Sequence, residues 1–296
     1  MSDAFFIQQF ETYLRAEKKM SAHTVTAYSA DIRACLAYAE AEFALQNIGD
    51  LTHLFIKSWL SGLMSDGMDA RSVRRKISAL KTYYRYLLRH QLVDYNPMLK
   101  VSSPKVSKKL PNFIEASKME VILDIAEAKK NEKNDAIAQD IVLTLYHTGV
   151  RLSELINLEK RHISLSQSLL KVTGKRNKER LIPMTAELST ILQPYLELHP
   201  ESPFVFNTSS GKKLYPNFVY RVVKDLLSAG STQRKNSPHV LRHTFATHLL
   251  NNGGDLNAIK ELLGHANLSA TQVYTHNSVE RLKTIHKQAH PKGRLK

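Results

Sequence analysis

The chain has 296 residues, of which 43% are hydrophobic and 23% charged, a balance typical of a globular protein of two domains. Its 42 Lys and Arg against 27 Asp and Glu give a net charge of +15. This excess favours a role of the positive charge in binding nucleic acid over a role in solubility alone. The single cysteine, Cys35, excludes an intramolecular disulfide and a multi-cysteine zinc site. No apolar run approaches the roughly 20 residues that cross a bilayer, and the N-terminus lacks a signal-peptide pattern. We therefore expect a cytoplasmic protein without a membrane partner.

Residues 1–95 predict an all-α domain, a helical bundle. Apolar side chains recur at helical spacing in four segments, near residues 5–14, 21–40, 51–63 and 70–90. The fourth segment has an apolar side and a basic side, and a basic side either is simply solvated or follows a phosphate backbone. The candidate DNA contacts on this segment are Arg71, Arg74, Arg75 and Arg85.

Residues 96–115 predict a linker between two domains. Prolines at positions 97, 104 and 111 interrupt helical periodicity, and a run of lysines adds positive charge. Lys105 and Lys108 are candidate phosphate contacts in this stretch. A linker that is merely solvated is equally consistent with the pattern.

Residues 116–296 predict an α+β domain that is mostly helical, so that the chain as a whole is mainly α. Helical periodicity covers residues 118–128 and 135–146, and Gly149 then allows a sharp turn that places Arg151 at the start of a short helix. Between residues 162 and 183 the period changes to two, which predicts a small three-stranded antiparallel sheet with a basic hairpin at residues 174–180. Helices near 186–198 and 217–227 and a short strand at 204–206 follow.

Residues 237–276 gather reactive side chains on three short helices and their junctions. His239 and His243 are four residues apart and share a helix face, a spacing that zinc ligands use. However, no Glu occupies the position that an HExxH zinc site requires, and no cysteine or carboxylate is placed to complete a site with His248. We predict no metal here and assign His243 and His248 to the fold.

Cleavage of a phosphodiester without metal uses more of these residues. It requires a nucleophile, positive charge on the non-bridging oxygens and an acid for the leaving alcohol. Tyr274 supplies a nucleophile, Arg151 and Arg242 supply two guanidinium forks, and Lys175 on the hairpin supplies an acid.

Two histidines extend this set. His239 lies three residues before Arg242 and faces the same way on a helix. His265 follows Gly264 and is placed to hydrogen-bond the phosphate. Each residue alone is a weak signal, but together they supply every role that the reaction requires.

Four sequence boxes connect these residues to a known family. They are TGVRLSEL at 148–155, GKRNKER at 174–180, HVLRHTFATHLL at 239–250 and LGHANLSATQVYTH at 263–276. In order and spacing, and over essentially the whole chain, the sequence resembles the tyrosine recombinases of the phage-integrase family and, among them, the Xer-type chromosome dimer resolvases. The resemblance implies a catalytic set of Arg151, Lys175, His239, Arg242, His265 and the nucleophile Tyr274. Arg176, a further candidate DNA contact, stands where relatives often have glycine.

The resemblance also implies an architecture and a mechanism. An N-terminal core-binding domain and a C-terminal catalytic domain would close on a double-stranded DNA recombination site. The tyrosine would form a 3′-phosphotyrosyl link and free a 5′-hydroxyl, and strand exchange would pass through a Holliday junction without metal, ATP or any other cofactor.

The end of the chain bears on assembly. A last helix at 278–289 either folds back on its own domain or, as the resemblance implies, enters a neighbour to build a homo- or hetero-tetramer with a related recombinase. Whether a DNA translocase is a further partner stays open.

Two other functions remain at this point. The first is a mobile-element integrase from a transposon or phage, which differs from a chromosome dimer resolvase in its DNA target. The second is a DNA-binding architectural protein that has lost catalysis, and the complete set of six residues argues against it. By resemblance we expect a recombinase of the chromosome, associated with the nucleoid.

Overall fold

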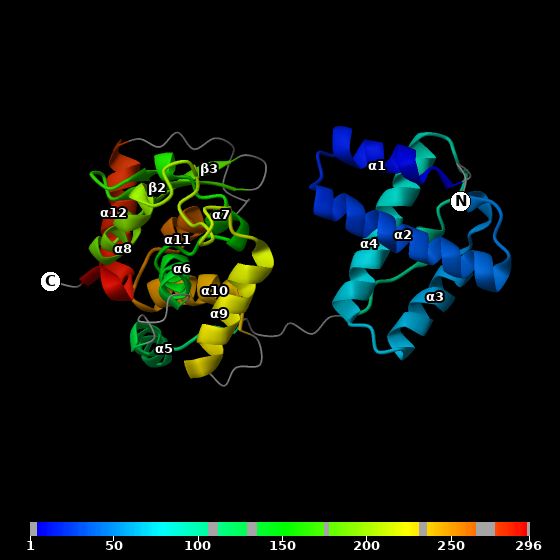
Figure 1. Ribbon diagram of the computed structural model, residues 1–296. Helices are drawn as coiled ribbons and strands as arrows, with labels where there is room; N and C mark the ends of the chain where they lie inside the picture. The colour runs from blue at the N-terminus through cyan, green and yellow to red at the C-terminus, as the bar shows by residue number, and fades with distance from the viewer. Residues whose placement is uncertain are drawn as a thin grey trace. The chain divides into compact units, whose positions relative to one another are not determined.

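The computed structural model describes residues 5–105, 112–128, 135–174, 178–230, 236–264 and 276–294. The chain divides into two compact units, residues 1–109 and 110–296 (Figure 1). Each unit has a hydrophobic core of its own. The predicted fold class is confirmed, since the described elements are mainly helices together with one small three-stranded antiparallel sheet. None of the helices in the described ranges combines the length and apolarity that crossing a bilayer demands.

The first unit consists of four α-helices, α1 (Ile7–Ala16), α2 (Ala22–Phe43), α3 (His53–Ser65) and α4 (Ala70–Arg89), and two 3-10 turns, η2 (Ile48–Asp50) and η3 (Pro97–Lys100). The last three α-helices begin where a side chain accepts a hydrogen bond from the first turn, at Ser21, Thr52 and Asp69. The core is built from one side of each helix and includes Phe10, Leu14, Ile32, Ile56, Ile77, Leu80, Tyr83 and Tyr84. The amphipathic pattern read from the sequence therefore matches the buried faces.

The second unit carries the sheet. It consists of β1 (Ile163–Ser164), β2 (Leu169–Thr173) and β3 (Glu179–Pro183), all antiparallel and in the order β1-β2-β3. Leu170 pairs with Ile182 and both side chains are fully buried, so the register places the apolar face of the sheet on the core. At the start of the β2–β3 hairpin, the backbone N–H of Gly174 donates to the carbonyl of Lys178.

Helices surround this sheet and each other: α5 (Ala116–Ala128), α6 (Asp135–Thr148), α7 (Leu152–Ile156), α8 (Ala186–Glu197), α9 (Pro216–Gly230), α10 (Pro238–Asn251), α11 (Leu256–Leu263) and α12 (His276–Ala289). Helix α6 lies near the middle of the unit and contacts α5, α8, α9 and α10 (Figure 1). Its C-terminal end is therefore held from several sides. The turn that carries Arg151 follows this end directly.

One predicted strand is wrong. Residues 204–206 form only an isolated bridge, between Glu159 and Phe204, and the backbone N–H of Val205 donates to the carbonyl of Leu158. Val205 and Phe206 are buried, and this burial explains the apolar run without a strand. Three consecutive apolar residues cannot reveal whether a partner strand is present.

The last helix packs against its own unit in this single chain. Helix α12 contacts α10, α11 and β3, and it buries Leu282, His286 and Ala289. Of the two interpretations of the C-terminal helix, the fold-back arrangement is therefore the one that the isolated chain adopts.

Candidate active site

A glycine turn aims Arg151 away from the core. Helix α6 ends at Thr148, and Gly149 has a left-handed backbone with φ of 60°. A Cβ atom at this position would lie 2.4 Å from Cδ1 of Phe245, so both the turn and the close packing require glycine. Val150 is buried on the other side of the turn. Arg151 then caps the start of α7, where 34% of its side chain is exposed.

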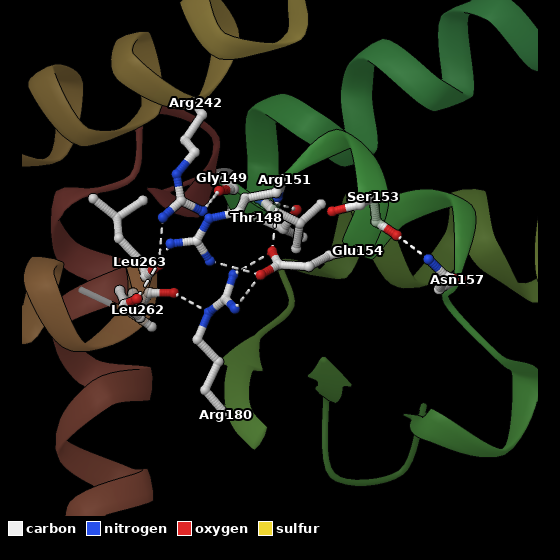
Figure 2. A network of polar contacts seen from close by, with 12 residues as sticks. Thr148, Gly149, Arg151, Ser153, Glu154, Asn157, Arg180, Arg242, Leu262 and Leu263 are labelled. Carbon is white, nitrogen blue, oxygen red and sulfur yellow. Dashed lines mark hydrogen bonds and ion pairs between the residues drawn. The ribbon is translucent and has the colours of Figure 1, made fainter. Parts of the chain in front are cut away.

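Glu154 holds Arg151 in place. Its Oε2 accepts a hydrogen bond from the backbone N–H of Arg151 (2.7 Å), and its Oε1 accepts another from Nη1 of the same residue (2.7 Å). Arg180 on β3 binds the same carboxylate with both Nη atoms, at 2.9 Å to Oε1 and 2.8 Å to Oε2. The carboxylate is thus shared by two arginines from different elements (Figure 2).

Glu154 is ionised despite its burial. Only 2% of its side chain is exposed, and burial by itself raises the pKa of a carboxyl group. The hydrogen bonds and positive charge of Arg180, with the hydrogen bonds of Arg151, outweigh this effect and lower the pKa of Glu154 to about 2. Glu154 therefore contributes one full negative charge to the cluster at neutral pH.

The C-terminal end of α11 binds three arginines. Its last carbonyl oxygens each accept a hydrogen bond from a different guanidinium: Leu262 O from Arg180 Nε (2.6 Å), Leu263 O from Arg242 Nη2, and Gly264 O from Arg151 Nη2 (3.2 Å) (Figure 2). The final carbonyls of a helix have no partner within the helix and carry partial negative charge. The helix end therefore offers the acceptors that keep three like charges close together.

Arg242 reaches the cluster from α10. Its Nη1 donates to the carbonyl of Gly149 (2.6 Å), and its Nη2 donates to α11 as described above. Burial lowers the pKa of Arg242 to about 9, with smaller contributions from the charges of Arg151 and Arg180 and an opposing one from Glu154. This guanidinium is therefore still protonated at pH 7.

The described part of the cluster has an excess of positive charge. It contains the guanidiniums of Arg151, Arg180 and Arg242 against the single carboxylate of Glu154. Two charges are left without a counter-charge among these four groups. Such a site suits an anion with several acceptor oxygens, such as a phosphodiester.

The other predicted site residues are placed unevenly. His239 is exposed on the first turn of α10, on the same helix as Arg242. Lys175, His265 and Tyr274 lie outside the described residues. The structure therefore brings Arg151 and Arg242 together and leaves the roles of the remaining residues as predictions.

The described chain nevertheless leads up to two of these residues. Gly174, which precedes Lys175, lies so close to Glu154 that a Cβ atom there would be 3.2 Å from Oε1. Gly264, which precedes His265, has φ of 63° and would place a Cβ atom 3.1 Å from Cδ of Arg180. Gly174 and Gly264 therefore both lie beside the arginine cluster.

Two residues of the cluster were absent from the prediction. Glu154 lies one helical turn after Arg151, a spacing at which opposite charges interact. Arg180 is only 4% exposed and occupies the same face of β3 as the fully buried Ile182. A charged residue at a core-facing strand position is the signal that could have identified it.

The remaining histidines of α10 belong to the fold. His248 is buried, and both of its ring nitrogens are hydrogen-bonded, Nδ1 to the Tyr146 hydroxyl (2.9 Å) and Nε2 to the Ile114 carbonyl (2.8 Å). His243 is half-buried with its ring edge-on to Phe113. Within the described ranges, no group of three or more His, Cys, Asp or Glu side chains is arranged to hold a metal ion.

The candidate DNA contacts of α4 are not equivalent. All four arginines are exposed, namely Arg71, Arg74, Arg75 and Arg85, but Arg75 is also paired with a buried carboxylate. Arg75 forms an ion pair with Asp31, whose side chain is 3% exposed and also binds Lys76 at 2.8 Å.

The remaining contacts lie elsewhere in the chain. Lys105 is exposed, whereas Lys108 and Arg176 lie outside the described residues.

Comparison with known proteins agrees with this arrangement. Residues 112–281 match the Phage integrase family, and residues 7–91 match the Phage integrase N-terminal SAM-like domain. The tyrosine recombinase XerC of Pelotomaculum thermopropionicum is 33% identical over an alignment of 305 positions that covers 97% of this chain and 98% of that protein. The tyrosine recombinase XerD of Listeria monocytogenes is 33% identical over 295 residues, which cover 97% and 99%.

A solved structure shares the fold. The XerH site-specific recombinase, bound to a palindromic difH substrate in a post-cleavage complex, gives a TM-score of 0.71 at 21% identity over 94% of this chain and 83% of that one. The family match spans more than half of the chain, and the relatives match it along nearly their full length. The chain therefore belongs to the phage integrase family and, within it, to the Xer-type tyrosine recombinases, enzymes that cleave and rejoin DNA strands at specific sites.

Proposed function

We propose that this chain recombines a double-stranded DNA site with Tyr274 as its nucleophile and resolves chromosome dimers before cell division. The observation that carries the proposal is the pair of Arg151 and Arg242, which come from separate helices and contact the same end of α11. Both guanidiniums retain N–H groups beyond those used in the described hydrogen bonds, and the four described groups of the cluster carry a net charge of two. A scissile phosphate placed there would receive a donor on each non-bridging oxygen.

The chemistry follows from the charge on the phosphate. The Tyr274 oxygen attacks phosphorus, the bond from phosphorus to the 5′ oxygen breaks, and Arg151 and Arg242 stabilise the charge that develops on the non-bridging oxygens. Lys175 donates a proton to the leaving 5′ oxygen, while the proton of the Tyr274 phenol passes to water. One phosphodiester replaces another, so no ATP is required, and the two guanidiniums supply the positive charge that the transition state needs. Attack by the 5′-hydroxyl of the other duplex reverses the step and, after two exchanges through a Holliday junction, recombines the sites.

His239 and His265 complete the proposed site. A phenol has an ordinary pKa near 10, so its attack requires cationic or hydrogen-bonding neighbours. His239 is exposed on the helix that carries Arg242, where it is free to contact a phosphate oxygen. His265 follows Gly264, whose carbonyl binds Arg151. Both histidines are proposed to hydrogen-bond the phosphate.

The two parts of the chain are proposed to divide the work. Residues 1–95 are proposed to bind the core of the DNA recombination site, and residues 96–115 to lie along the phosphate backbone of the DNA. Residues 116–296 are proposed to cleave the DNA strand. The exposed arginines of α4 support the first role. The site of action is the chromosome in the cytoplasm, at the nucleoid.

Assembly is proposed to use the last helix. Leu282, His286 and Ala289 of α12 are buried against the second unit of the same chain. The same side chains fit the same surface of an identical or closely related neighbour, so exchange of α12 would close a homo- or hetero-tetramer without requiring a new interface. Removal of residues after His276 should abolish the tetramer and leave duplex binding intact. A truncated chain that still forms tetramers would exclude this arrangement.

The experiment that tests the function is a trapping reaction. The binding site is first located by footprinting on the source chromosome. A duplex of this site is then made with a nick beside the scissile phosphate, so that cleavage releases the short fragment that carries the free 5′-hydroxyl and the reaction cannot reverse. We expect a covalent protein–DNA complex in the presence of EDTA and the absence of ATP. A protein that binds and footprints the site but never forms the complex would be an architectural protein. Footprints at the ends of a mobile element rather than near the replication terminus would favour an integrase.

A further inference from the structure

We propose that Arg180 is a positioning residue for DNA cleavage, which sets the orientation of Arg151 through Glu154. The proposal rests on the proposed function, because it concerns the same site. Arg180 lies on β3 opposite Val172, with only 4% of the residue exposed, so it is not available to bind DNA itself. Burial of a guanidinium is costly unless its donors are paired. The pairing therefore indicates the role of the residue.

The contacts form a chain from α11 to Arg151. Nε of Arg180 donates to the Leu262 carbonyl (2.6 Å), and this bond fixes the plane of the guanidinium. The two Nη atoms then bind the two oxygens of Glu154, at 2.9 and 2.8 Å, and so fix the plane of the carboxylate. Oε1 of Glu154 also accepts from Nη1 of Arg151 (2.7 Å), and this contact directs the exposed guanidinium. Each step leaves little rotational freedom to the next.

Close packing restricts the same pair. A Cβ atom at Gly264 would lie 3.1 Å from Cδ of Arg180, and one at Gly174 would lie 3.2 Å from Oε1 of Glu154. Two backbone segments thus approach the pair so closely that a Cβ atom on either would be a tight contact. The Arg180–Glu154 pair is held by its surroundings as well as by its own hydrogen bonds.

Charge balance alone would not require this geometry. A lysine at position 180 would also neutralise Glu154, but an ammonium group lacks the planar fork and cannot bind both carboxylate oxygens and the Leu262 carbonyl in one plane. Arg180→Lys therefore keeps the charge and removes the orientation. A matched control is Arg161→Lys, because Arg161 pairs with Glu159 at 2.6 Å but its side chain is 76% exposed.

The test compares the full chain and its variants on the nicked trapping substrate. With DNA in excess, the single-turnover cleavage rate of Arg180→Lys should fall about 100-fold, the scale expected for a misplacement of about 1 Å. DNA affinity at fixed salt should change little, while the melting temperature should fall because buried hydrogen bonds are lost, with the chain still folded at the assay temperature. Arg161→Lys should match the wild type in all three measurements. The double variant Arg180→Met with Glu154→Gln, which has no buried charge to compensate, should fold and still cleave slowly.

A double-mutant cycle with Arg151→Lys tests the route of action. If Arg180 acts through Arg151, Arg180→Lys should have less than about a threefold further effect once Arg151 is already changed. Multiplied effects, a folded Arg180→Lys protein with wild-type cleavage, or a loss that only follows the unfolded fraction would each overturn the proposal. Failure of the wild type to form any covalent complex is a separate result, which would reject the proposed function and this inference with it.

Discussion

Replacement of Glu154 by Gln removes the carboxylate that Arg151 and Arg180 share. The variant keeps the size of the side chain and one acceptor oxygen but loses the negative charge. The pKa of Glu154 is lowered from its ordinary 4.5 to about 2. Because each pKa unit corresponds to 1.36 kcal/mol, the ionised carboxylate stabilises the fold by about 3 kcal/mol at neutral pH. We expect Glu154→Gln to lower the free energy of unfolding by about this amount.

The stabilisation by Glu154 should decrease as the pH falls. Since the pKa is lower in the folded chain than in the unfolded chain, the unfolded chain takes up the proton first as the pH falls. The stabilisation is therefore complete above pH 4.5 and is lost progressively toward pH 2. The Gln variant lacks this group, so the difference in stability between the two proteins should shrink over the same window.

Urea unfolding followed by far-UV circular dichroism, at several pH values from 7 down to 2.5, measures this difference. Trp59 is the only tryptophan and lies in the first unit, so its fluorescence provides an internal control that should not differ between the two proteins. Parallel loss of stability in both proteins between pH 4.5 and 2.5 would refute the lowered pKa of Glu154 and the shared carboxylate with it.

Two further predictions concern one glycine pair and one arginine pair. Gly264→Ala should destabilise the chain more than Gly253→Ala. Both glycines have positive φ, which costs an alanine roughly 1 kcal/mol at each position. A Cβ atom at Gly264 would also lie 3.1 Å from Cδ of Arg180, whereas one at Gly253 would meet nothing within 4 Å. Equal shifts of the melting temperature in the two variants would contradict the close contact between Gly264 and Arg180. Arg74→Ala should lower the slope of log DNA affinity against log salt concentration by about 1. Arg75→Ala should lower this slope by clearly less, because a buried carboxylate already pairs with Arg75. Equal slopes for the two variants in a titration from 50 to 200 mM salt would show that this ion pair opens on DNA.

Local pattern was enough to predict most of the elements. Helical periodicity identified the four helices of the first unit, and the change to period two identified the three strands, in which Leu170 and Ile182 face the core. The glycine at position 149 placed Arg151 at the start of a short helix. These features depend on residues that are neighbours in the sequence, so the sequence pattern carries them directly.

Contacts between distant residues could not be predicted in this way. Arg180 and Glu154 are 26 positions apart, and Arg180 and the Leu262 carbonyl are 82 apart. A backbone carbonyl as acceptor has no signature in the sequence, because every residue has one. Likewise, Arg75 looked equivalent to Arg74 until its partner, 44 positions away, was visible. The resemblance to a family named the candidate catalytic residues, but the groups that hold them in place required the tertiary structure.

In the proposed mechanism, Arg151 and Arg242 hold a phosphate for attack by Tyr274. Mass spectrometry of the trapped complex, after nuclease and protease digestion, tests it most directly, because the chain contains 12 tyrosines and fragmentation of the modified peptide identifies which one carries the adduct. We predict a nucleotide adduct on Tyr274 alone, no adduct in Tyr274→Phe, and a wild-type yield in Tyr220→Phe, which alters an exposed tyrosine of α9. An adduct on any other residue, or one that survives Tyr274→Phe, would contradict the account.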